Sequence, residues 1–72
     1  MRGNFFYKKL GKRIIKIRKI SHLSQESLAL LSDIDRTYLA RLEQGRGNPT
    51  IKMLHKLCRC LRIKIHQLVK DL

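Results

Sequence analysis

The spacing of apolar residues constrains the fold of this 72-residue chain more than any other feature of its sequence. Leu10, Ile14 and Ile17 are separated by four and three residues, which places them on one face of a helix. Similar spacing recurs in the later segments, whereas the strict alternation typical of a half-buried strand forms no convincing pattern. The sequence therefore predicts an all-α fold, a compact domain of five helices.

Short polar residues indicate where these helices begin. Ser24, Asp35 and Thr50 each stand before an apolar periodic segment, where a side-chain oxygen accepts a hydrogen bond from a free backbone N–H of the helix. Gly45 ends a helix because glycine adopts positive φ readily, and Pro49 disfavours helix in the residue before it. We expect helices over residues 6–20, 25–32, 36–44, 51–61 and 65–71. The apolar residues of the second, third and fourth helices, which we expect to form the core, are Leu28, Ala29, Leu31, Leu39, Leu42, Ile51, Leu54, Leu57, Cys58 and Leu61.

Charge indicates the kind of partner. Seventeen Lys and Arg residues against five Asp and Glu residues give a formal charge of +12, and residues 1–25 contain cations but no acidic residue. Such a field favours polyanions, nucleic acid first and an anionic membrane surface second. A domain this small leaves little room for a catalytic cleft, and no nucleophile–base set is evident, so we expect no enzymatic activity.

The sequence also limits location and organisation. It contains no run of about 18 apolar residues that would span a membrane, and the cluster Phe5-Phe6-Tyr7 is too short for a signal peptide. Cys58 and Cys60 point to different faces of one predicted helix and cannot pair there. We therefore expect a cytoplasmic protein with a basic and aromatic segment at residues 1–9 and a folded domain at residues 10–72.

A few residues resemble metal ligands in type but not in arrangement. His55 and Cys58 are three residues apart on a predicted helix, and Cys60 and His66 follow nearby. Zinc sites usually have four ligands at recognised spacings, and Cys58 also fits the apolar face of its helix. We predict no metal site and no cofactor.

Two short predicted helices, separated by residues 33–35, have the arrangement of a helix-turn-helix. On the second of them Leu39 and Leu42 face the core, and the outward residues are Arg36, Thr37, Ala40, Arg41 and Gln44. A DNA major groove about 12 Å wide accepts one helix, in which Arg donates to guanine and a methyl group contacts thymine. The simpler alternative is that these are ordinary solvent-exposed residues.

Several motifs in this order resemble the lambda-repressor-like (XRE) helix-turn-helix family over about residues 10–69. The most specific are Ser-Gln-Glu-x-Leu-Ala at residues 24–29, Leu-Glu-x-Gly at 42–45 and Asn-Pro-Thr at 48–50. Asp-Arg-Thr-Tyr at residues 35–38 is similar to restriction–modification controller proteins in particular. The resemblance implies a lambda-repressor-like fold and binding to double-stranded DNA.

The resemblance also implies a role for each matching residue. Bases would be read by Arg36, Thr37 and Arg41, with Ala40 as an apolar contact. Phosphates and backbone would be met by Gln25, Tyr38, Gln44, Arg46 and Asn48, although Tyr38 fits the core equally well. Arg18 and Glu43 would form a partly buried ion pair, and Gln25 would also brace the DNA-reading helix.

The chain departs from the family pattern at its turns. His22, Asp33 and Arg62 stand where the family usually has glycine after a helix, so we expect mildly strained left-handed backbone there. Lys64 replaces the usual hydroxyl cap of the last helix, so we expect that helix to be short or stabilised by a partner.

We expect a sequence-specific transcriptional regulator that binds double-stranded DNA as a homodimer on a two-fold-related operator. The expected dimer surface is Ile63, Ile65, Leu68 and Val69, unless these residues form the core of a monomer. One alternative is an antitoxin-type protein-interaction module that also binds DNA. A basic membrane-active peptide is a third class, against which the capped helices argue.

Overall fold

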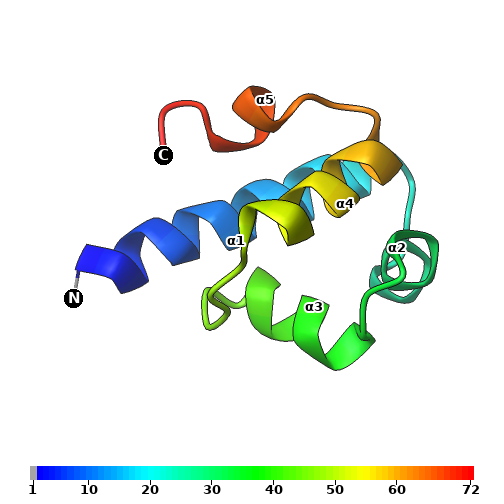
Figure 1. The fold of residues 1–72 in the computed structure, drawn as a ribbon, viewed down its shortest axis with the longest axis horizontal. Coiled ribbons are helices and arrows are strands. Elements are labelled where there is room, and N and C mark those ends of the chain that lie inside the picture. Colours follow the sequence, from blue (N-terminus) through cyan, green and yellow to red (C-terminus); the bar gives the residue numbers. More distant parts are fainter. Residues whose placement is uncertain (1) are drawn as a thin grey trace.

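The computed structural model describes residues 2–72, which form five α-helices and no β-strand. The helices are α1 (Arg2–Ile20), α2 (Gln25–Ser32), α3 (Arg36–Glu43), α4 (Ile51–Leu61) and α5 (Ile65–Val69). Figure 1 shows α1 along the length of the molecule, with α3 and α5 on opposite sides of it. Among the helices of residues 2–72, none has both the length and the apolar character needed to cross a bilayer.

Three helices differ from their predicted bounds, one of them α3, which ends at Glu43 rather than at residue 44. α1 begins at Arg2 rather than at residue 6, so the aromatic cluster continues the helix. In the added part of the helix, the Phe5 ring lies one turn before Lys9, whose Nζ is 4.7 Å from the ring centroid. α5 ends at Val69, two residues before the predicted end, because Lys70 has extended backbone angles.

The predicted caps hold the starts of α2, α3 and α4. Ser24 Oγ accepts from the backbone N–H of residue 27 at 2.9 Å, Asp35 Oδ2 from that of residue 38 at 3.2 Å, and Thr50 Oγ1 from that of residue 53 at 3.1 Å. α5 lacks such a cap, and the Gln67 side chain instead accepts from the Lys64 backbone N–H at 2.7 Å.

Left-handed backbone occurs at all three turns where the family usually has glycine. His22, Asp33 and Arg62 have φ values of 60°, 56° and 58°, and Asp71 also has a φ of 60°. This region costs a residue with a Cβ roughly 1–2 kcal/mol. The fold tolerates that strain because each of the three turns joins helices that share one core.

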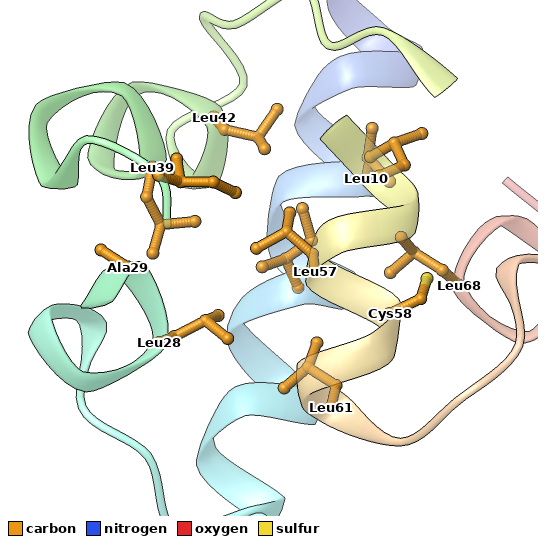
Figure 2. Packing of buried hydrophobic residues seen from close by; sticks show 12 residues of the cluster. Leu10, Leu28, Ala29, Leu39, Leu42, Leu57, Cys58, Leu61 and Leu68 are labelled. Atoms are coloured by element: carbon orange, nitrogen blue, oxygen red, sulfur yellow. The ribbon is translucent and has the colours of Figure 1, made fainter. Parts of the chain in front are cut away.

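The core lies where α1, α2, α3 and α4 meet (Figure 2). Its fully buried large residues are Leu10, Ile14, Leu28, Leu39, Leu42, Leu57 and Leu68. Two residues expected to be buried are not, since Leu31 is 61% exposed and Ile51 is 64% exposed. The buried face of α2 is centred on Leu28, Ala29 and Ser32, which turns Leu31 outward, and Ile51 is the first residue of α4.

The core also takes one residue that we expected on a dimer surface. Leu68 is 0% exposed, so it packs inside its own chain and cannot contribute to an interface of the folded protein. A helix as short as α5 needs such an anchor, because it has few other apolar residues to hold it. Ile63, Ile65 and Val69 are half-buried beside this core.

Arg13 of α1 fixes the C-terminal end of α5. Its guanidinium donates to the backbone carbonyls of Gln67 and Leu68, both at 3.2 Å, and of Lys70 at 2.9 Å. The last carbonyls of a helix lack partners within the helix, and a cation near them also offsets the helix dipole. A residue that the sequence presents only as one of many cations is therefore a structural clamp.

Candidate nucleic-acid interface

The outer face of α3 is cationic and the inner face is apolar. Arg36, Thr37 and Arg41 are exposed, whereas Leu39 and Leu42 are completely buried beneath them. The Asp35 cap begins the helix directly before Arg36, so its first outward residues have a defined direction. This arrangement presents two guanidinium groups and a hydroxyl from a short rigid helix.

The loop after α3 shares one surface with this helix. An open hollow of about 450 Å³ is lined by Asp35, Thr37, Tyr38, Arg41, Arg46, Gly47 and Asn48. Two residues predicted to read bases, Thr37 and Arg41, thus meet three that are predicted to contact phosphates, Tyr38, Arg46 and Asn48. Arg36, Ala40 and Gln25 are not among the residues that line this hollow. Gln44, the C-cap of α3, is exposed beside the loop, and Ala40 is half-buried on the helix.

The sequence left open whether Tyr38 packs in the core or contacts a phosphate, and its position allows both. Its side chain is half-buried and packs against the core, while the residue also lines the hollow. Burial raises the pKa of the Tyr38 phenol above its ordinary value, since the phenolate would lose hydration there. The hydroxyl therefore remains a neutral hydrogen-bonding group at physiological pH.

A buried ion pair joins α1 to the back of α3. Arg18 Nε donates to Glu43 Oε2 at 2.7 Å and Arg18 Nη2 donates to Glu43 Oε1 at 3.0 Å. The side chains are 12% and 3% exposed, respectively. Arg18 Nη1 also donates to the Leu23 carbonyl at 3.1 Å. The bidentate geometry fixes α3 against α1, as the family resemblance implied.

Gln25, the first residue of α2, is part of the same network. Its Nε2 donates to Glu43 Oε1 at 3.0 Å, so α1, α2 and α3 meet at one carboxylate. A glutamine amide carries two hydrogens, which leaves a second donor on Nε2. The bracing geometry is thus present, while the phosphate contact of Gln25 stays a prediction.

Close backbone packing fixes the loop after α3 against α1. Gly45 has a φ of 79°, and a Cβ there would lie 2.7 Å from Lys8 Cγ and 2.8 Å from Lys8 Cα. A Cβ on Gly11 would lie 2.5 Å from the Glu43 carbonyl oxygen. The Tyr7 hydroxyl donates to Asn48 Oδ1 at 2.9 Å. Spacing in the sequence could not reveal this last contact, because it joins residues 41 positions apart.

The residues considered as metal ligands do not converge. Cys58 is buried in the core, Cys60 is half-buried and His55 is exposed. Within residues 2–72, no three His, Cys, Asp or Glu side chains are grouped so that they could hold a metal ion.

Comparison with known proteins shows which family this chain resembles. A family model described as Helix-turn-helix matches residues 14–68. Control protein C.MunI of a Mycoplasma species is 37% identical over 65 residues, which cover 89% of this chain and 88% of that protein. The immunity repressor protein of Bacillus phage phi105 is 37% identical over 62 residues, which cover 86% of this chain and 43% of the repressor.

A solved structure has the same arrangement of helices. The restriction-modification controller protein C.AhdI from Aeromonas hydrophila is 37% identical and superposes with a TM-score of 0.84. The match covers 86% of this chain and 94% of C.AhdI. The lambda-repressor-like fold predicted from the motifs is thereby confirmed, as is the resemblance to controller proteins. The chain therefore belongs to the XRE-type helix-turn-helix family of DNA-binding transcriptional regulators, whose members are not enzymes.

Proposed function

We propose that this protein binds double-stranded DNA sequence-specifically, with α3 in the major groove, as a homodimer on a two-fold-related operator. The observation that carries the proposal is the two-sided character of α3. Its exposed residues Arg36, Thr37 and Arg41 lie on the face opposite two fully buried leucines. Hydrogen bonds to Glu43 from one residue of α1 and one of α2 hold the helix against both of these neighbours. A helix fixed in this way can enter a groove without losing its own structure.

The proposal gives each residue of the interface a role. Arg36 and Arg41 donate to guanine edges, while the Thr37 methyl and Ala40 contact thymine methyl groups. Phosphates are bound by Gln25, Tyr38, Gln44, Arg46 and Asn48. This division is supported by the hollow, in which Arg41 of α3 and Arg46 and Asn48 of the loop face one surface.

The proposed dimer surface consists of the predicted residues other than Leu68, which is buried in the core. Ile63, Ile65 and Val69 are half-buried at the C-terminal end of the chain, around the short helix α5. In a two-fold dimer, the two α3 helices would lie about 34–36 Å apart, one turn of DNA. The operator is then expected to contain two half-sites related by a two-fold axis.

Base reading is tested by selecting bound sites from a random pool of DNA duplexes. We expect an enriched sequence with two-fold symmetry, and Arg36→Ala should relax the preference at one position and cost about 1–3 kcal/mol of binding. Lys16→Ala, an exposed residue of α1, is the matched control and should weaken all duplexes slightly and equally. Unchanged preference in Arg36→Ala would show that Arg36 does not read bases.

Dimerisation is tested by sedimentation of the free protein and of Val69→Lys. The wild type should self-associate at micromolar concentrations, whereas the buried charge should leave the variant monomeric. Thermal unfolding of dilute samples serves as the control for folding of the variant. A wild type that is monomeric at high micromolar concentration would contradict dimerisation of the free protein.

A further inference from the structure

We infer that Tyr7 is a positioning residue that holds the Asn48 side-chain amide in the orientation needed to bind a DNA phosphate. The inference rests on the proposed function, because it concerns one phosphate contact of that interface. Tyr7 itself lies on α1 and is assigned no contact with DNA. Its hydroxyl donates to Asn48 Oδ1 at 2.9 Å, from a helix 41 residues earlier in the chain.

The chemistry of an asparagine side chain makes this contact directional. The amide has one oxygen, which only accepts hydrogen bonds, and one NH₂ group, which only donates. A phosphodiester oxygen is an acceptor, so an outward-facing Oδ1 would repel it. The Tyr7 hydroxyl occupies Oδ1 and leaves the Nδ2 hydrogens as the donors available to an anion. This hydrogen bond thereby holds the amide in the orientation that the structure shows before DNA arrives.

Both partners of this hydrogen bond are held in place independently. The close approach of Lys8 to Gly45 leaves no room for a Cβ on the glycine, which fixes the loop against the next residue of α1. The Phe6 ring stands edge-on to the Tyr7 ring, with centroids 5.5 Å apart and planes at 73°. Figure 1 shows the loop between α3 and α4 beside the N-terminal half of α1.

Asn48 also lies where a phosphate is expected. It is exposed and lines the hollow together with Arg46 and Arg41, two permanent cations. An anion drawn to these guanidinium groups would meet the Asn48 amide at the rim of the same surface. An amide that is already oriented loses less freedom on binding than one that rotates freely in solvent.

The test is a double-mutant cycle in DNA affinity, with Tyr7→Phe, Asn48→Ala and the double variant. Fluorescence anisotropy with the duplex enriched by selection should show each single variant binding about three- to tenfold more weakly, the value of one hydrogen bond. The double variant should bind no more weakly than Asn48→Ala alone. Equal effects of Tyr7→Phe in both backgrounds, or no effect at all, would overturn the inference.

Two comparisons separate positioning from loss of packing or charge. Phe5→Leu removes an exposed ring from the same turn of α1 but keeps the Tyr7 hydroxyl, so its affinity should equal that of the wild type. The salt dependence of Tyr7→Phe should match that of the wild type, because a neutral amide releases no counterions. Arg46→Ala, by contrast, should reduce that slope by about one. A reduced slope in Tyr7→Phe would overturn the inference.

A measurement without DNA keeps this inference separable from the proposed function. In the free protein, NMR relaxation of the Asn48 Nδ2 group should report slower motion in the wild type than in Tyr7→Phe. Equal motion in both would overturn the inference whatever the DNA measurements show. A wild type that binds no DNA selectively, but retains this difference in motion, would instead contradict the proposed function. Asn48→Ala binding as tightly as the wild type would overturn the inference, since no contact would remain to be positioned.

Discussion

Glu43 connects three helices through one carboxylate. It accepts two hydrogen bonds from Arg18 of α1 and one from Gln25 of α2, and its side chain is only 3% exposed. The bidentate Arg pair and the amide together satisfy most of the lone pairs of the carboxylate, which a buried charge requires. The orientation of α3, and with it the candidate DNA-reading face, depends on this residue.

We predict that Glu43→Ala destabilises the fold by about 3–5 kcal/mol, because it strands the Arg18 guanidinium in a largely buried site. Urea unfolding gives this free energy directly. Glu26→Ala, which removes an exposed acid from α2, is the matched control and should change stability by less than about 0.5 kcal/mol. Similar losses of unfolding free energy in the two variants would show that the buried ion pair stabilises the fold no more than an exposed acid does.

The two thiols should differ in reactivity. Burial raises the pKa of the Cys58 thiol above its ordinary value, so less of the reactive thiolate forms, and access is blocked as well. Cys60 is half-buried on the same helix. We expect iodoacetamide to label native Cys60 faster than Cys58 by a factor of at least about ten. Cys60→Ser should resist labelling until the protein unfolds, and rapid labelling of that variant would contradict the burial of Cys58.

Individual contacts were predictable only where a motif records them. The Arg18–Glu43 pair follows from the family resemblance, and the structure contains it. The partners of Arg13 and of Tyr7 did not follow, because they lie more than 40 residues away in the sequence. A cation or an aromatic residue on an exposed stretch of helix gives no local sign of such a partner.

Helix boundaries were predictable where they depend on local chemistry. Ser24, Asp35 and Thr50 cap the helices they were expected to cap, since capping involves only residues three apart. The start of α1 was wrong because the apolar spacing that predicted this helix begins only at Leu10, whereas the helix itself continues back to Arg2. Leu31 was wrongly expected to be buried, because α2 rests on its partners through Ser32 and not through that leucine.

We predict that Arg13→Gln loosens α5 specifically. The change removes three hydrogen bonds to the end of that helix, two of them largely exposed, so we expect a loss of about 1–2 kcal/mol. Amide hydrogen exchange should become faster in residues 65–69 than in α2 or α3. Lys16→Gln removes an equal charge from an exposed residue of α1 and should leave that exchange unchanged. Uniform acceleration in all helices would contradict a local clamp.

Positive charges lie both on α1 and on α3, which indicates separate roles in attracting DNA from a distance and in recognising its bases. The described residues extend over only 31 × 23 × 21 Å, and the chain carries a formal charge of +12. α3 contributes few of these charges, while exposed lysines lie along α1. With a screening length of about 10 Å at 0.1 M salt, such lysines still act on approaching DNA, but only weakly once salt is raised. The cations of α1 are therefore expected to guide association, and those of α3 to select the sequence.

This division predicts the kinetics of a variant in which Lys12, Lys16 and Lys19 of α1 are all changed to Gln. Loss of long-range attraction should slow association with DNA several-fold at low salt, while dissociation and the order of preferred duplexes stay the same. The association rates of variant and wild type should converge as salt rises, because screening removes the attraction from both. Stopped-flow binding at several salt concentrations measures this, with Arg36→Ala as the variant that should change preference instead. Faster dissociation in the lysine variant would mean that α1 contacts the bound duplex directly, and would contradict the separation.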